Sequence, residues 1–263
     1  MTGTFPAQPI TTPLEWSDLV LDEATQRDVA DIVTWVRHHD MLMNEWRLAR
    51  RLKPGFRSFF HGPPGTGKTL TACLLGKQVG LPVYRVDLAK IMSNYIGEAG
   101  TSVHDLFESA QREHWILFFD EADALFGKRT ERQSANDRAA DLQAAYLLRK
   151  IEDYPWVAIT ATNLQSHVDD AFARRFQSVI QFRMPDAEQR LRLWRDSFRG
   201  LTLAADVDLE RLAQDYELCG GNIVNVLRYA CLQAVQREPP LIGEGDLLEG
   251  VRRELRKDGR SAA

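Results

Sequence analysis

The stretch that most constrains the fold of this chain is GPPGTGKT, at residues 62–69. It follows an apolar run, RSFFH at 57–61, that indicates a buried strand, and it opens a run with helical spacing from Lys68 to Val79. The stretch matches the pattern G-x-x-x-x-G-K-[ST] in full, between a strand and a helix. The sequence therefore predicts an α/β fold with a phosphate-binding loop after one strand.

The residue types in this loop suit a nucleoside triphosphate and Mg²⁺. Glycines let backbone N–H groups turn inward around phosphate oxygens, and a helix N-terminus adds positive potential. Lys68 is expected to reach the β- and γ-phosphates, and Thr69 to hold the metal ion. A simple Gly/Pro turn before a helix is the alternative. The predicted nucleotide-binding residues of the loop are Gly62, Pro63, Pro64, Gly65, Thr66, Gly67, Lys68, Thr69 and Leu70.

A second motif, ILFFDEAD at 116–123, carries two acidic residues directly after an apolar strand. Asp120 is placed to bind Mg²⁺ through water, and Glu121 to orient the attacking water. In-line attack on a γ-phosphoryl group needs a positioned nucleophile and neutralised charge more than covalent chemistry. An acidic pair at a strand end is often only a polar end, but the preceding loop argues against that here.

Two further motifs follow in the chain. ITATN at 159–163 ends a strand with Asn163, which can hydrogen-bond the γ-phosphate or the water, although such an asparagine usually caps a turn. DDAFARRF at 169–176 presents Arg174 and Arg175 together. Adjacent arginines are most often a solvated helix end. In a phosphoryl-transfer protein they are also candidates for insertion into a neighbouring active site.

Composition narrows the class of protein. Of the 263 residues, 44% are apolar and 27% are charged, which is ordinary for a soluble globular protein, and the net charge of -4 does not indicate a surface that coats nucleic acid. No apolar run approaches the roughly 20 residues that cross a bilayer, and the N-terminus lacks the pattern of a secretory signal. Cys73, Cys219 and Cys231 have no metal-type spacing, and their odd number argues against a disulfide framework, so a reducing, cytoplasmic setting is expected.

The pattern along the chain predicts two domains after a flexible tail at 1–13. Residues 14–185 alternate strands and helices, which predicts a five-stranded parallel sheet between helices. Residues 186–263 show helical periodicity only and predict a lid domain. Helices are expected near 22–39, 44–51, 68–79, 103–113, 138–152, 187–199, 207–216, 221–236 and 244–256, and strands at 57–61, 82–87, 115–120, 156–162 and 178–182.

The order of these motifs resembles the AAA+ ATPases, and more narrowly the AAA subfamily of katanin, spastin and the membrane-anchored AAA proteases. The resemblance covers about residues 15–256. It implies ATP hydrolysis with Mg²⁺ in a homo-oligomeric ring, usually of six subunits, with ATP bound between neighbours. It also implies that Asn163 is the sensor-1 residue and that Arg174 and Arg175 act in trans.

One departure concerns the lid. Many AAA+ branches carry a sensor-2 arginine at the start of the third lid helix, where this chain has Gly220, Gly221 and Asn222. Small residues there resemble the AAA subfamily, in which this helix end packs near the base and ribose, so Gly221 is predicted to contact the nucleotide. Arg228 lies about two turns further on and is not assigned to the phosphates.

The stretch NYIGEAG at 94–100 is unusually apolar for a loop. In rings of the family this connection faces the central channel and grips the substrate polypeptide, which implies that role for Tyr95, Ile96 and Gly97. An aromatic face contacts many side chains without sequence preference, and a glycine lets the loop move. The alternative is that Tyr95 packs into the core.

The segment 126–155 has a narrower resemblance, to bacterial AAA ATPases encoded with extracellular contractile injection systems. Its polar part, 127–137, is either a second pore loop or a solvated surface loop. The favoured function is an ATP-driven remodeller of proteins, acting on a protein substrate or adaptor, with neither membrane nor nucleic acid as partner. The alternatives are a nucleic-acid-linked AAA+ ATPase, such as a loader or transposition helper, and a small-molecule kinase.

Overall fold

The computed structural model describes residues 5–93, 99–125, 135–163, 173–257 and 259. The chain divides into two compact units, each described below by itself. Unit 1 consists of residues 1–15, 23–62 and 68–181, and unit 2 of residues 16–22, 63–67 and 182–263.

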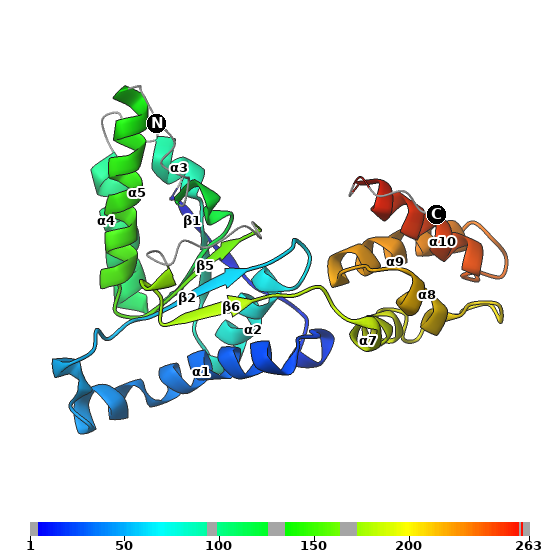
Figure 1. The fold of residues 1–263 in the computed structure, drawn as a ribbon, viewed down its shortest axis with the longest axis horizontal. Coiled ribbons are helices and arrows are strands. Elements are labelled where there is room, and N and C mark those ends of the chain that lie inside the picture. Colours follow the sequence, from blue (N-terminus) through cyan, green and yellow to red (C-terminus); the bar gives the residue numbers. More distant parts are fainter. Residues whose placement is uncertain (1–4, 94–98, 126–134, 164–172, 258, 260–263) are drawn as a thin grey trace. The chain divides into compact units, whose positions relative to one another are not determined.

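Unit 1 is built on a six-stranded sheet with the order β1-β3-β4-β5-β2-β6 (Figure 1). The strands are β1 (Ala7–Ile10), β2 (Phe56–His61), β3 (Val83–Val86), β4 (Ile116–Phe119), β5 (Val157–Thr162) and β6 (Ser178–Gln181). The five strands from β2 to β6 pair in parallel, as the alternation of strands and helices predicts. Strand β4 is buried along its whole length, which fits the near-continuous apolar run that carries it.

The sixth strand, β1, lies in the segment that the sequence analysis assigned to a flexible tail. It pairs antiparallel with β3 at one edge of the sheet, with Ala7 opposite Val86. The N–H of Asp87 extends the pairing by donating to the carbonyl of Pro6 at 2.9 Å. Pro9 lacks an N–H donor, so this segment suits an edge position, where one side of the strand needs no partner.

Helices cover both faces of the sheet, α3, α4 and α5 on one and α1 and α2 on the other (Figure 1). Their bounds are α1 (Glu23–Asp40), α2 (Lys68–Val79), α3 (Leu88–Ser93), α4 (Ala99–Glu113) and α5 (Ala135–Asp153), with 3-10 turns at η1 (Trp16–Asp18) and η4 (Ala122–Leu125). The helix expected at 44–51 is wrong: a π-helical turn, η2 (Met41–Glu45), continues α1, and a 3-10 turn, η3 (Leu48–Arg50), follows. Arg47 separates them with φ at 58°, a left-handed value that no continuous α-helix accommodates.

The core between the sheet and α4 and α5 holds one buried polar link. Tyr154 is 2% exposed, and its hydroxyl lies 3.1 Å from the carbonyl oxygen of Ala110 and 2.6 Å from that of Trp115. Burial raises the pKa of this phenol far above its usual range, so it stays protonated and can donate. The hydroxyl therefore ties the end of α5 to the turn between α4 and β4.

Replacing Tyr154 by phenylalanine is expected to lower the free energy of unfolding by about 1–3 kcal/mol. The two buried carbonyl groups would lose a partner that no water replaces. Chemical denaturation followed by circular dichroism measures the change. Tyr146→Phe, at a position on α5 with 37% exposure, is the matched control and should change stability by less than about 0.5 kcal/mol. Equal effects of the two substitutions would contradict a structural role of the buried hydroxyl.

In the described part of unit 2, four α-helices surround a separate apolar core that includes Trp194, Leu218, Ile223 and Leu247. They are α7 (Ala187–Ser197), α8 (Leu209–Asp215), α9 (Gly220–Ala234) and α10 (Glu244–Lys257). Asp186 begins α7 by accepting from the N–H of Gln189, in a reciprocal capping box. None of the helices in the described part of the chain is long and apolar enough to cross a bilayer. The domain boundaries given in the sequence analysis stay a prediction.

Candidate nucleotide-binding site

The loop at 62–69 connects β2 to the first turn of α2, in the position that its sequence predicts. Gly62, Gly65 and Gly67 have φ values of 142°, 75° and 103°. L side chains rarely adopt such values, because their Cβ would crowd the backbone, so glycine is required at these turns. A loop of this kind can bring its backbone close to a phosphate group.

Lys68 folds back over this loop. Its side chain is buried, with 6% exposure, and its Nζ donates a hydrogen bond of 2.8 Å to the carbonyl oxygen of Gly62. A buried ammonium group is costly unless oxygen atoms surround it. Since phosphate oxygens are charged acceptors, they bind such a cation more strongly than a neutral carbonyl does. The position of Lys68 therefore fits a polyphosphate ligand.

His61, the last residue of β2, is a neighbour of this lysine that the sequence analysis did not single out. Burial lowers the pKa of His61, and the positive charge of Lys68 lowers it further. Its ring stacks on Phe59, with ring centroids 5.8 Å apart and an angle of 14° between planes. The imidazole is therefore held neutral at neutral pH, and it adds no second cation beside Lys68.

The acidic pair follows β4. Asp120 is partly exposed, and its Oδ1 accepts a hydrogen bond of 3.0 Å from the N–H of Glu121. Glu121 is exposed and has φ at 51°, a left-handed value that is uncommon outside glycine. Such a conformation costs free energy and is most often found at functional sites. The sequence assigns different tasks to the two carboxylates, and this unusual turn lies between them.

Strand order brings the candidate residues to one edge of the sheet. Strand β5 lies between β4 and β2, and its last residue, Thr162, is in register with His61. Asn163, directly after Thr162, therefore lies beside the start of the phosphate loop at Gly62. The hydroxyl of Thr162 donates to Oδ1 of Asp123, which joins the ends of β5 and the acidic turn after β4. Nothing in the spacing of these two residues along the sequence predicts that they touch, so the link appears only in the structure.

Within unit 2, the middle of the phosphate loop packs against the first turn of α9. The N–H of Gly221 donates to the carbonyl oxygen of Gly65 at 3.1 Å. A Cβ on Gly65 would lie 2.5 Å from Sγ of Cys219, and one on Gly221 would lie 3.1 Å from Cα of Gly65. This close approach explains the small residues at 219–221. The contact of Gly221 with a nucleotide remains a prediction.

Arg174 and Arg175 lie away from this edge. Both are exposed and come before β6, and β6 runs parallel to β2 with Ser178 beside Ser58 and Gln181 beside His61. They are therefore at the amino end of the strands, whereas the phosphate loop is at the carboxyl end. The four residues of β6 alone span roughly 13 Å at about 3.3 Å per residue. Arg175 Nη1 pairs with Glu152 Oε1 at 2.8 Å.

Two predicted elements lie wholly or mostly outside the described residues. These are Tyr95, Ile96 and Gly97 of the first pore loop and residues 127–134, the larger part of the second. The helices that flank the first of these segments are α3 and α4.

These features define a nucleotide-binding α/β protein of the P-loop class: a parallel sheet with a glycine-rich loop, a buried lysine and an acidic turn on the neighbouring strands. Residues 58–184 match the model of the ATPase family associated with various cellular activities, AAA. By this match the chain carries an AAA ATPase domain, and ATP hydrolysis is the reaction of that class.

Individual relatives point the same way. The chain is 33% identical over 190 residues to an uncharacterized AAA family ATPase, y4kL, of Sinorhizobium fredii, covering 72% of this chain and 56% of the relative. It is 31% identical over 236 residues to ATP-dependent zinc metalloprotease FtsH 3 of Sphaerobacter thermophilus, covering 87% and 47%. It is 31% identical over 205 residues to the proteasome-activating nucleotidase of Methanopyrus kandleri, covering 75% and 47%. The chain thus spans about half the length of these curated relatives.

Proposed function

We propose that this chain is the subunit of an ATP-driven ring, usually of six copies, that remodels or unfolds proteins through a central pore. One observation carries the proposal. Gly62 at the start of the phosphate loop, the acidic turn and Asn163 follow the carboxyl ends of β2, β4 and β5, whereas Arg174 and Arg175 lie at the amino ends of the strands. Arginines that serve the transition state must therefore reach the nucleotide of a neighbouring copy.

In this proposal the residues of the first edge divide the chemistry of ATP hydrolysis among them. Lys68 binds the β- and γ-phosphates. Glu121 orients a water molecule and accepts its proton as the water attacks in line, and Asn163 hydrogen-bonds the water or the γ-phosphate. Electrostatic stabilisation dominates such reactions, because the transition state has little covalent demand on the protein.

Thr69 and Asp120 are proposed to hold Mg²⁺, the first through its hydroxyl and the second through water. The side chain of Thr69 is exposed at the start of α2, and Asp120 is partly exposed after β4, so both are open to a ligand. Oxygen donors of this kind are what Mg²⁺ prefers. When bound, the ion neutralises charge on the phosphates and orients them.

Two of the relatives are named as a metalloprotease and as a proteasome-activating nucleotidase. These names support a polypeptide rather than a nucleic acid as the substrate. Within this proposal, Tyr95 and Ile96 contact the polypeptide in the pore and Gly97 lets the loop move. The cytoplasm is the proposed location, and a contractile injection system is the proposed biological setting, on the resemblance of 126–155 alone.

A Tyr95→Ala chain is expected to keep its fold and to lose at least about tenfold of its unfolding rate on a tagged protein substrate. The alanine removes the aromatic face that would grip the polypeptide. Thermal stability, basal ATP turnover and substrate-stimulated turnover are measured on one preparation. Tyr146→Ala, on the exposed face of α5, is the control.

Two outcomes would contradict this role for Tyr95. A large loss of thermal stability would place its ring in the core, and unchanged unfolding of the substrate would remove it from the pore. Turnover that DNA stimulates in a salt-sensitive manner would instead favour a nucleic-acid-linked ATPase.

A further inference from the structure

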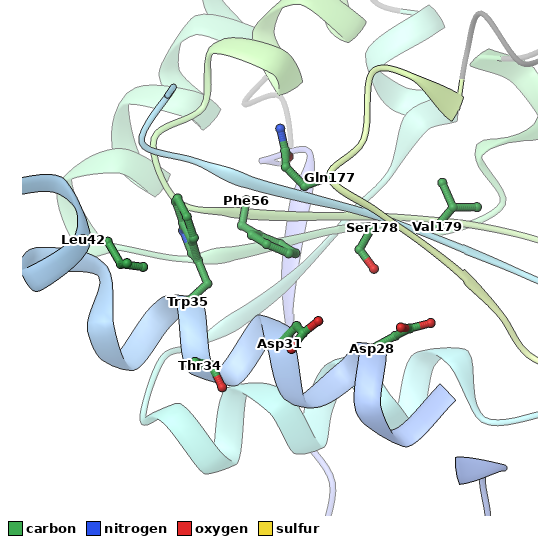
Figure 2. A pocket seen from close by; sticks show the side chains of 9 residues that line it. All are labelled: Asp28, Asp31, Thr34, Trp35, Leu42, Phe56, Gln177, Ser178 and Val179. Atoms are coloured by element: carbon green, nitrogen blue, oxygen red, sulfur yellow. The ribbon is translucent and has the colours of Figure 1, made fainter. Parts of the chain in front are cut away.

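A groove of about 480 Å³ lies in unit 1 between α1 and the amino ends of the strands β2 and β6 (Figure 2). Asp28 and Asp31 line it from α1, and Trp35 from the same helix stands beside Phe56 of β2. Val179 of β6 lines the other side and is 39% exposed. The groove therefore combines two acidic side chains with an apolar floor.

The acidic side of this groove has unused binding capacity. Among the residues that the structure describes, neither Asp28 nor Asp31 has an ion pair or hydrogen bond through its carboxylate. The two are three residues apart, so they share one face of α1. Two neighbouring carboxylates without a cation favour a positively charged partner, because each raises the negative potential at the other.

The floor of the groove suits an aromatic side chain. The rings of Trp35 and Phe56 lie 5.5 Å apart between centroids at an angle of 46°. Strand β6 is the edge of the sheet on this side, which leaves the exposed Val179 beside the floor. Aromatic groups bury a large area and pair favourably with other rings. A partner with a ring next to cations would satisfy both parts of the groove.

The same unit presents a surface of that kind. We call residues 46–51, WRLARR, the basic segment. Trp46 is 64% exposed, and the three arginines of the segment, Arg47, Arg50 and Arg51, are all exposed. No ion pair involves these arginines within the described part of the chain. Tryptophan and arginine are the residues most enriched among those that dominate binding energy at protein interfaces.

We propose that two copies of this chain pair, with Trp46 of each copy on the Trp35–Phe56 floor of the other and Arg50 and Arg51 against its Asp28 and Asp31. The charges and the apolar groups of the two surfaces are complementary, and among the described residues neither set of charges has an ion-pair partner. The basic segment follows α1 almost directly in the chain, through η2. Since each copy carries both the groove and the basic segment, a two-fold axis lets both copies make the same contact.

This pairing is independent of the nucleotide-dependent ring proposed above. It uses none of the residues assigned to the nucleotide site, so it is tested without nucleotide. Failure of the ring proposal would leave it standing, and the reverse also holds.

The test is charge reversal, with mass measured by sedimentation equilibrium on the nucleotide-free chain. The parent is expected to form dimers. Asp28→Lys/Asp31→Lys and Arg50→Glu/Arg51→Glu are each expected to weaken pairing about tenfold or more, because like charges then face each other. An equimolar mixture of the two variants is expected to pair again, since each reversed surface then meets its opposite.

Asp105→Lys/Glu108→Lys is the matched control, because it changes two exposed acidic residues three apart on α4. It should leave pairing unchanged. Trp46→Ala, which alters an exposed side chain only, is the second variant and should also weaken pairing. A monomeric parent, masses that none of the substitutions change, or variants whose mixture does not pair would each overturn the proposal. Weakening by the arginine pair alone would point to an acidic partner surface elsewhere.

Discussion

A Glu121→Gln chain is expected to bind ATP with parental affinity and to hydrolyse it on the order of 10²–10⁴ times more slowly. Glutamine keeps the size and hydrogen-bonding shape of the side chain but cannot accept a proton from water. Glu121 is exposed at a left-handed turn directly after Asp120, whose assigned task is metal binding. Binding of a fluorescent ATP analogue and release of phosphate, each at saturating Mg²⁺, separate the two functions.

Lys68→Ala provides the opposite result. Removal of the buried ammonium group is expected to abolish nucleotide binding itself, because Lys68 is the cation held at the start of the loop by the carbonyl oxygen of Gly62. For Glu121→Gln, the matched control is Glu188→Gln, which removes one carboxylate at an exposed position in the first turn of α7. Its ATP binding and turnover should match those of the parent. If Glu121→Gln turned over ATP at the parental rate, the base would have to be another residue.

The Glu121→Gln variant also reports on assembly. If ATP is bound between neighbouring copies, a chain that binds but does not hydrolyse ATP should accumulate as closed rings. Mass photometry with and without ATP is the measurement. A mass that ATP does not change would contradict the proposed ring.

The second large effect concerns the paired arginines. Arg174→Ala/Arg175→Ala is expected to reduce turnover on the order of 10³–10⁵-fold, the range found where an arginine stabilises transition-state charge. Since these residues lie at the sheet edge opposite the phosphate loop, the loss should arise in the neighbouring site. Mixing this variant with Glu121→Gln should restore part of the activity, because some interfaces then hold both an intact arginine pair and an intact glutamate.

The control for this experiment separates a catalytic role of Arg175 from a structural one. Glu152→Gln removes the partner of Arg175 at 2.8 Å but leaves the guanidinium in place. Because Arg175 is exposed and Glu152 only half-buried, the pair remains open to solvent, and its loss should cost about 1 kcal/mol of stability or less. Activity should survive this change. Mixed rings that show no recovery, with their mixing demonstrated by mass, would mean that the arginines act within their own chain or only support the fold.

The local structure of this protein could be predicted from its amino-acid sequence. The phosphate loop, the acidic turn after β4 and the alternation of strands and helices follow from patterns within a few residues. Glycine at the positive-φ turns, a lysine at the helix start and an unbroken apolar run in β4 are short-range requirements, so they are visible in the order of residues. The AAA family resemblance rests on these same motifs, and it is confirmed.

The tertiary structure alone decided which of these parts meet. Strand order put β5 between β4 and β2, which joins Thr162 to Asp123 and brings Asn163 beside the loop. The tertiary structure also places the two arginines at the opposite edge and adds Ala7–Ile10 to the sheet as a sixth strand. It forms the acidic groove from residues of α1, β2 and β6. The physical reason is that strand pairing depends on contacts between segments distant in the chain, whose energies no local window contains.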